Sequence, residues 1–308
     1  MQRVKTMVSS IFPSSPLSIE RVAEGVSTHV YRIIFERETF YLRVLPEGGA
    51  SFAPEVTVHE RLRQMHVKVP EVIYFEAYNE LFERSIMVMT EIRGQSISQS
   101  NSLPEETRAE ILREAGRDLA AINSIAVEGF GWIQRDLAKS SDLYGQWTVY
   151  RAFMLEYWES DLAYLSRDVI SSLEAMQLNH VLLQHDSWLD VEQGSLAHGD
   201  FGTPHIYQEG GRYTGIIDFG EIRGTDRWYD LGYFHLQAGE QLPPGLETAL
   251  MKGYMEVVPL EMECEHCIRF ASLLICMRAL ARSLQKRPPN WYTQYLAEML
   301  RKELAFLL

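Results

Sequence analysis

Cysteine is scarce in this sequence, and long uncharged apolar runs are missing. Three cysteines among 308 residues, an odd number, argue against the disulfide framework of a secreted domain. The segment CEHC at 264–267 has no second Cys or His pair at a metal-binding spacing, which favours buried thiols on a helix. The most apolar stretch, FASLLICM at 270–277, is bounded by Arg269 and Arg278 and is too short to cross a bilayer. The N-terminus has no long apolar segment either, so we expect a cytoplasmic protein without a membrane span.

Positive charge is also in short supply. The sequence has 29 Lys and Arg against 42 Asp and Glu, a formal net charge of -13. A field of this sign repels phosphate backbones and anionic membrane surfaces and attracts cations. Nucleic acid and membranes are therefore not expected as partners, whereas a cationic small molecule would be attracted. Repeats and low-complexity tracts are absent, and the oligomeric state, monomer or homodimer, stays open.

The first third of the chain is dominated by strand patterns. Two runs of β-branched and aromatic residues, at 29–36 and 39–46, are separated by a charged turn and predict a β-hairpin. After Pro54, apolar side chains recur from Val58 at helical spacing and predict a helix, and two further strand-like runs follow. Residues 1–93 are therefore expected to form a small, β-rich α+β lobe.

The composition then changes, which indicates a second lobe over residues 94–308. The segment RGQSISQSNSLPEE at 93–106 is polar and has the character of a linker. Ser102 and Glu105 predict a capping box with Pro104 in the first turn of a helix, and helical spacing continues beyond it.

Most of this lobe is expected to be helical, with one exception. Residues 196–217 contain short strand-like pieces around a Gly-Gly turn. The aromatic stretch at 147–165 has helical spacing and is interpreted as core packing rather than a substrate cage. Glu261, Glu263 and Glu265 form either a solvated charged face or an ammonium pocket, and the sequence leaves both interpretations open.

The segment LAHGDFGTPHIY and the later Asp218 carry the pattern that points to chemistry. His198 and Asp200 lie two positions apart, His205 follows, and Asp218 ends the apolar strand GIID. Carboxylates at the ends of short strands that flank one hairpin can converge in space. Phosphoryl transfer uses such a pair: one carboxylate accepts the proton of the attacking hydroxyl, and the other holds the Mg²⁺ that bridges the nucleotide phosphates. The layout is that of kinases, with His205 where Asn is expected.

At these residues the chain resembles the aminoglycoside phosphotransferase-like kinases. Their catalytic loop typically reads H-G-D, and an Asp-rich segment follows, here GTDRWYDLG at 224–232. The resemblance extends over nearly the whole chain. It implies a bilobal protein-kinase-like fold, ATP or GTP as phosphoryl donor, and Mg²⁺ or Mn²⁺ as the metal. It also implies a small-molecule hydroxyl acceptor: an aminoglycoside or related antibiotic first, with macrolides, choline, homoserine, sugars and fructosamines as alternatives.

Roles for individual residues follow from the same resemblance. Asp200 corresponds to the catalytic base, and His198 belongs to the catalytic loop that it would brace. Asp218 corresponds to the principal metal ligand and His205 to the position of the second ligand. Asp226 and Asp230 are interpreted as structural carboxylates that bond backbone N–H groups near the catalytic segment.

The small lobe is expected to hold the nucleotide in the turn AEGVSTHVYRI. There Gly25, Ser27 and Thr28 would present backbone N–H groups and hydroxyls to phosphate oxygens. This expectation competes with the simpler interpretation of an ordinary hairpin loop.

Two further parts of the nucleotide site are expected on the strands and helix of this lobe. Arg43 stands where kinases carry Lys, with Glu55 as its expected partner, and solvated charges are the alternative. Backbone groups around Glu91 and Ile92 would contact the base, and Met89 would line its pocket.

Two other classes of protein remain as alternatives. Arg43 and His205 depart from the kinase pattern, which would suit a nucleotide-binding pseudokinase that regulates a partner. A protein kinase is disfavoured because the sequence has no APE segment and no recognisable activation loop after Asp218.

Overall fold

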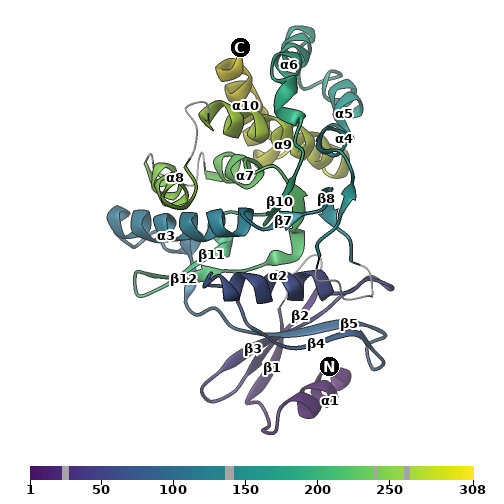
Figure 1. The fold of residues 1–308 in the computed structure, drawn as a ribbon, viewed down its shortest axis with the longest axis vertical. Helices are drawn as coiled ribbons and strands as arrows, with labels where there is room; N and C mark the ends of the chain where they lie inside the picture. Colours follow the sequence, from purple (N-terminus) through teal and green to yellow (C-terminus); the bar gives the residue numbers. More distant parts are fainter. Residues whose placement is uncertain (23–27, 136–141, 239–241, 244, 260–263) are drawn as a thin grey trace.

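The computed structural model describes residues 1–22, 28–135, 142–238, 242–243, 245–259 and 264–308, and it has two lobes (Figure 1). The smaller lobe contains an antiparallel sheet in the order β1-β2-β3-β5-β4. Its elements are α1 (Gln2–Ile11), β1 (Ser18–Val22), β2 (His29–Ile34), β3 (Thr39–Val44), α2 (Ala53–Gln64), β4 (Val72–Asn79) and β5 (Arg84–Thr90).

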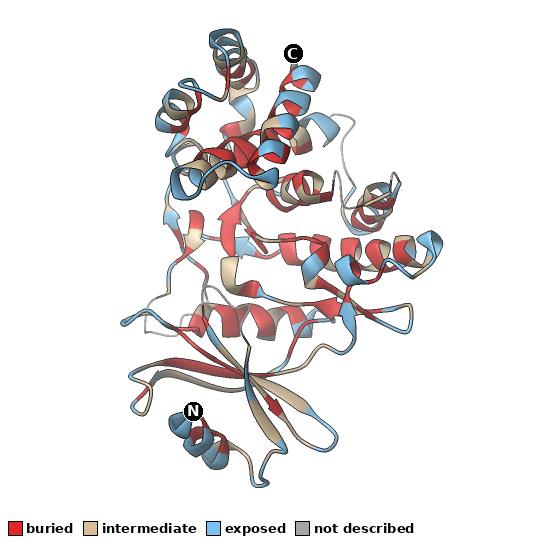
Figure 2. Cartoon of the chain, turned by 180° about the vertical axis from the view of Figure 1, so that it is seen from behind, coloured by how far each residue is buried: buried red, intermediate tan, exposed pale blue. Residues whose placement is uncertain are grey.

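The predicted hairpin and the helix after it are both confirmed. Strands β2 and β3 pair antiparallel from His29–Val44 to Ile34–Thr39, and Pro54 lies in the first turn of α2. Helix α2 is buried on several sides and lies between the sheet and the larger lobe (Figure 2). Val58 and Leu62 join the apolar core of the larger lobe, so α2 fixes one lobe against the other.

Helix α1 covers the face of the sheet that is turned away from the larger lobe (Figure 1). Val4, Met7 and Val8 are buried there against Ile33 and Val88. The spacing of these three residues is that of an amphipathic helix, but ten polar-rich residues at a chain end give a weak signal.

The larger lobe is mainly helical, which confirms the predicted α+β class. It contains a sheet in the order β7-β10-β13-β8-β9 and a smaller one in the order β12-β11-β6. Its elements are β6 (Gln95–Ser96), η1 (Ile97–Gln99), α3 (Glu105–Asn123), β7 (Ala126–Val127), β8 (Phe130–Ile133), β9 (Gly145–Trp147), α4 (Tyr150–Met154), α5 (Trp158–Leu165), α6 (Ser172–Gln184), η2 (Asp186–Leu189), β10 (Gly194–Ala197), η3 (Thr203–His205), β11 (Ile206–Glu209), β12 (Arg212–Ile216), η4 (Phe219–Glu221), β13 (Arg223–Thr225), α7 (Tyr229–Ala238), α8 (Leu246–Val257), α9 (Cys264–Lys286) and α10 (Trp291–Leu307).

Three local predictions need correction. The capping box of Ser102 and Glu105 does not form, because Pro104 is the N-cap of α3 and no side chain caps the helix. The aromatic stretch at 147–165 is split between β9, α4 and α5 rather than forming one helix. Of the three thiols on α9, only that of Cys276 is fully buried.

In the described part of the chain, no helix is both long and apolar enough to cross a membrane.

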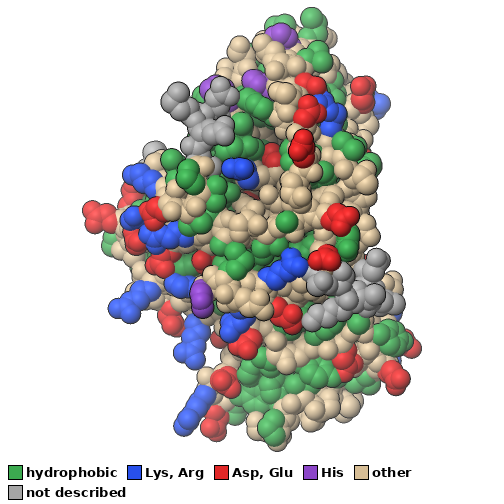
Figure 3. Space-filling model, viewed as in Figure 1, with side chains coloured by type: hydrophobic (Ala, Val, Ile, Leu, Met, Phe, Trp, Pro, Cys, Tyr) green, Lys and Arg blue, Asp and Glu red, His purple; other side chains and the backbone are tan. Residues whose placement is uncertain are grey.

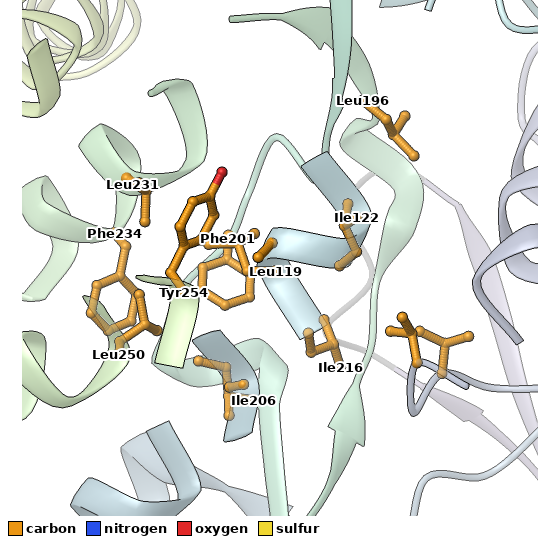
Figure 4. Close-up of a cluster of buried hydrophobic side chains, with 14 of the residues drawn as sticks. Leu119, Ile122, Leu196, Phe201, Ile206, Ile216, Leu231, Phe234, Leu250 and Tyr254 are labelled. Carbon is orange, nitrogen blue, oxygen red and sulfur yellow. The ribbon is translucent and has the colours of Figure 1, made fainter. Parts of the chain in front are cut away.

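The core of the larger lobe anchors the segment that contains Asp200. Side chains of α3, α7 and α8, among them Leu119, Phe234 and Tyr254, pack with Phe201, which directly follows Asp200 (Figure 4). Helices α3 and α8 approach so closely that a Cβ on Gly253 would lie 1.8 Å from a backbone oxygen of α3. At their outer surface, acidic and basic side chains of the two helices lie side by side (Figure 3).

His235 joins three helices of this lobe through charge. Its Nδ1 lies 2.5 Å from Glu247 of α8, and its Nε2 lies 2.9 Å from the fully buried Glu303 of α10. Burial lowers the pKa of His235, but hydrogen bonds to the two carboxylates outweigh burial and raise it to about 9. The imidazolium form therefore stabilises the packing of α7 against α8 and α10 at neutral pH.

We predict that this contact makes stability fall in alkaline solution. Since the folded-state pKa is about 9 and that of a free His is 6.5, the stabilisation is complete below pH 6.5. It is lost as pH rises through 9, by about 3 kcal/mol in total. Urea unfolding at pH 6.5 and 9.5 should show this fall in the wild type and in His180→Gln, an exposed control. His235→Gln should lack it, and an equal fall in all three proteins would contradict the assignment.

Candidate active site

The loop after β10, which carries His198 and Asp200, is held by a buried carboxylate. Asp230, in the first turn of α7, accepts hydrogen bonds from the backbone N–H groups of His198 (2.8 Å) and Gly199 (2.9 Å). Asn123 donates to the same carboxylate at 3.0 Å. Gly199 has φ of 84°, and a Cβ there would lie 2.0 Å from the carbonyl oxygen of Glu221, so this position requires glycine. The predicted bracing role of Asp230 is confirmed.

Asp226 also acts on the backbone, as predicted. Its carboxylate accepts a hydrogen bond from the N–H of Trp228 at 3.2 Å. Burial raises the pKa of Asp226 to about 6, although a hydrogen bond with Tyr150 and backbone N–H groups oppose the rise.

His198 lies inside the protein rather than in the cleft. Its ring is fully buried, its Nε2 donates to the carbonyl of Ile217 at 2.9 Å, and its Nδ1 accepts from the N–H of Asp200 at 3.3 Å. These bonds require the neutral ring, and burial lowers the pKa of His198 accordingly. The side chain supports the loop. Because the ring is fully buried, it cannot contact a reactant in the cleft.

Asp200, His205 and Asp218 meet at one wall of the cleft. The Nδ1–H of His205 donates to the backbone carbonyl of Asp200 at 2.7 Å. The same ring lies 3.9 Å from a carboxylate oxygen of Asp200 through Nδ1 and 3.9 Å from one of Asp218 through Nε2. The hydroxyl of Tyr233 donates to the other carboxylate oxygen of Asp200. Both carboxylates are partly exposed, at 36% for Asp200 and 51% for Asp218.

The hydrogen bond of His205 decides which nitrogen is available to a ligand. Because Nδ1 carries the proton, Nε2 keeps its lone pair and faces Asp218. Asp218 has φ of 68°, a left-handed conformation that turns its side chain at the end of a strand, and Asp tolerates it better than most residues. Among the described residues, no group of three His, Cys, Asp or Glu side chains could hold a metal. A metal bound here would therefore be held by one carboxylate and one imidazole of the protein. A nucleotide and water would have to supply its other ligands.

Arg43 and Glu55 are brought together by the fold. Arg43 lies 2.6 Å from one oxygen of Glu55 and 4.0 Å from Asp218, and Glu55 is 1% exposed. The second oxygen of Glu55 lies 3.2 Å from Arg135, which also donates to the carbonyl of Gly220 at 2.6 Å. Burial raises the pKa of Glu55, and the two guanidinium groups oppose that rise. This chain of contacts connects α2 with the loop that carries Asp218.

Of the other residues predicted for the nucleotide site, only some line the cleft. Thr28, Met89 and Ile92 line the cleft. Glu91 does not: its N–H bonds the carbonyl of Thr39, and its carboxylate accepts from Arg32 and Tyr41. The backbone N–H of Glu91 is therefore not free to contact the nucleotide base, as the prediction required. Gly25 and Ser27 lie outside the described residues.

The cleft itself is large and is lined by both lobes. Its volume is about 2030 Å³, and its walls include Arg43 from the sheet and Asp200 and Asp218 from the larger lobe. Several aromatic residues of the 147–165 stretch, such as Trp147 and Tyr157, also line it, so that stretch is not only core. Glu265 is absent from the lining and pairs with Arg269 at 3.1 Å, which favours the solvated face; Glu261 and Glu263 lie outside the described residues.

Comparison with known proteins identifies the family. A model of the phosphotransferase enzyme family matches residues 18–263. The chain belongs to this family. Hygromycin-B 4-O-kinase of Escherichia coli is 23% identical over 221 residues, which are 68% of this chain and 60% of that protein. An aminoglycoside 3'-phosphotransferase of Enterococcus faecalis is 23% identical over 226 residues, 68% of this chain and 76% of that protein.

Solved structures of family members share the fold. A thermostable mutant of aminoglycoside phosphotransferase APH(4)-Ia, in a complex with AMP-PNP and hygromycin B, superposes with a TM-score of 0.71 at 18% identity over 98% of both chains. A structure of APH(2")-IIIa with GDP and kanamycin gives 0.65 at 16% identity over 99% of both chains. The predicted bilobal kinase-like fold of this phosphotransferase family member is thereby confirmed.

Two residues of the site could not be recognised in the sequence. Tyr233 lies on α7 one turn after Asp230, where an aromatic residue has the pattern of core packing. Arg135 follows β8 and meets Glu55, its partner from 80 positions earlier in the chain, only in the folded structure. A local pattern carries no information about either contact.

We predict that Glu55→Gln weakens both folding and nucleotide binding. The substitution removes the charge that two guanidinium groups share in a buried place, which should lower the free energy of unfolding by about 3 kcal/mol. Because Arg43 loses its orientation, the Kd of a fluorescent ATP analogue should rise about tenfold. The matched control is Glu71→Gln in an exposed pair with Arg63, where a change below about 0.5 kcal/mol is expected. Equal effects of the two variants would contradict the proposed role of this pair.

Proposed function

We propose that this chain transfers the γ-phosphoryl group of ATP or GTP to a hydroxyl group of a small molecule. The observation that carries the proposal is the convergence of Asp200 and Asp218 on one cleft, with the ring of His205 at 3.9 Å from each. Family membership and relatives solved with AMP-PNP and GDP support a nucleotide donor.

Asp200 is proposed as the general base. One of its oxygens accepts the hydroxyl of Tyr233, so the other remains to accept the proton of the substrate hydroxyl. The substrate oxygen then forms a bond to the γ-phosphorus, and the bond from phosphorus to the bridging oxygen breaks. The electron pair leaves with ADP or GDP, and the proton passes from Asp200 to solvent.

Arg43 is proposed to hold donor phosphate. Its guanidinium is permanently charged, is oriented by Glu55 and lies 4.0 Å from Asp218, so phosphate oxygens bound beside Asp218 would be within its reach. The proposal also assigns Thr28, Met89 and Ile92 to the nucleotide side of the cleft, which they line.

Asp218 and the Nε2 of His205 are suited to bind Mg²⁺ or Mn²⁺. Mg²⁺ prefers oxygen ligands, whereas Mn²⁺ accepts an imidazole nitrogen more readily. When bound, such an ion neutralises the charge of the phosphates. His198 and Asp230 would contribute only by holding the loop.

The names of the relatives make aminoglycosides the first acceptors to test. Macrolides, amino alcohols and sugars follow, since one fold can serve many acceptors. A nucleotide-binding regulator is the second candidate, because His205 and Arg43 replace the usual residues.

We predict that Asp200→Asn lowers phosphoryl transfer by at least about 100-fold, because the variant has no base for the hydroxyl proton. Nucleotide consumption would be measured with Mg²⁺ or Mn²⁺ against an acceptor panel, and binding of a fluorescent ATP analogue should persist. Asp168→Asn, an exposed control outside the cleft lining, should match the wild type. Undiminished transfer by Asp200→Asn would exclude it as the base, and a biological effect that survives without turnover would favour the regulator.

A further inference from the structure

The part of the cleft formed by α9 carries a stripe of positive charge. The stripe consists of Arg278, Arg282 and Lys286, which follow one another at intervals of four residues and line the cleft. Leu274, one turn earlier, lines the cleft as well. Side chains at this spacing share one face of a helix. Arg287 continues the stripe just beyond the end of α9 and also lines the cleft.

Of these four cations, only Arg278 is neutralised by a described carboxylate. Arg278 donates to both oxygens of Asp161, at 2.8 and 3.0 Å. Arg282, Lys286 and Arg287 are exposed, and within the described ranges no carboxylate lies at ion-pair distance from them. Three positive charges therefore face this end of the cleft without a partner from the described chain.

The acidic residues of the cleft do not offset this excess. Asp161 is paired with Arg278, and Glu221 lies 3.2 Å from Arg223. Asp200 and Asp218 belong to the proposed phosphoryl-transfer site. Among the other described carboxylates that line the cleft, only Glu156 has no cation at ion-pair distance in the described chain. Among the described residues, a polycationic acceptor would face more repulsion than attraction at this end of the cleft, whereas an anion would find free donors.

Aromatic side chains stand beside the stripe. The Cζ atom of Arg278 lies 3.8 Å from the centroid of the Tyr157 ring, and Trp147 lines the same cleft. Trp291, at the start of α10, lines the cleft and is 72% exposed. An exposed indole at a cleft rim is suited to cover the flat or apolar body of a ligand.

Helix stability alone explains only part of this arrangement. Cations in the last turn of a helix interact favourably with its dipole, which accounts for Lys286 and Arg287. Arg278 and Arg282 lie further inside α9, where that effect is weak, and they face the cleft.

We propose that the acceptor carries an anionic group, a carboxylate or a phosphate, which binds Arg282, Lys286 and Arg287, and an aromatic or apolar portion that packs on Trp291. This inference rests on the proposed phosphoryl transfer and replaces the polycation suggested by the net charge and the relatives. The stripe gives a local positive field within an acidic protein, so acceptor binding weakens as salt rises.

The test compares acceptors that share one sugar and one ring. Phenyl glucoside, phenyl glucuronide and phenyl glucoside 6-phosphate differ in charge, and kanamycin represents the polycations. Phosphoryl transfer is followed by nucleotide consumption and by product mass, and binding is followed by tryptophan fluorescence of the nucleotide-loaded protein. At least one anionic compound should bind at least tenfold more tightly than phenyl glucoside, and which of the two does so identifies the anion.

Charge variants then assign the preference to the stripe. The double variant Arg282→Gln with Lys286→Gln should raise the KM of the anionic acceptor about tenfold, with kcat and the KM of phenyl glucoside unchanged. The control, Arg212→Gln with Lys302→Gln, removes the same charge from exposed positions outside the cleft lining and should change neither constant. A purely helix-stabilising role would lower the stability of the first variant and leave its KM intact.

The outcomes separate the two proposals. If kanamycin is phosphorylated and binds more tightly than the anionic compounds, the phosphotransferase assignment stands and the anionic acceptor is wrong. If no compound is phosphorylated, the reaction is wrong, and binding alone decides the acceptor: equal Kd values for phenyl glucoside and both anionic compounds overturn it.

Discussion

The hydrogen bonds from the N–H groups of His198 and Gly199 to the buried Asp230 hold the loop of Asp200, the proposed base, in place. They fix the turn after β10, from which Asp200 points into the cleft. His205, further along the same segment, then bonds the carbonyl of Asp200 and turns its free nitrogen toward Asp218. The loop itself is anchored by Phe201 in the core of α3, α7 and α8 (Figure 4). The proposed chemistry thus depends on backbone positions that a carboxylate outside the cleft stabilises.

A second set of contacts joins the lobes at the same place. Arg43 of the sheet and Arg135 of the larger lobe share the carboxylate of Glu55, and Arg135 reaches the loop after Asp218. Glu55 lies on α2, whose apolar residues belong to the core of the larger lobe. Placement of Arg43, the proposed phosphate-binding cation, is therefore coupled to the loop with the proposed metal ligand. Such coupling fits a site in which the nucleotide lies between the lobes.

The sequence predicted the parts whose signals are local. The hairpin, the helix after Pro54 and the carboxylates at strand ends all have short-range patterns, and the family resemblance supplied the order of the lobes. Contacts between distant positions, such as Arg135 with Glu55, leave no such pattern. Aromatic spacing at 147–165 did not distinguish core from cleft wall, because both bury one face of a ring. Net charge describes the whole surface: at -13 it favours a cationic acceptor, whereas three exposed cations of one segment, Arg282, Lys286 and Arg287, line the cleft.

The most direct test of the account is the magnetic coupling between Mn²⁺ and nitrogen in the complex with a non-hydrolysable ATP analogue. If Asp218 and the Nε2 of His205 hold the same ion beside the nucleotide, pulsed electron paramagnetic resonance will detect an imidazole nitrogen. His205→Ala will remove that signal while the analogue still binds. A nucleotide-bound Mn²⁺ without nitrogen coupling in the wild type, or a signal unchanged in the variant, would contradict the central claim that these side chains converge on the donor phosphates.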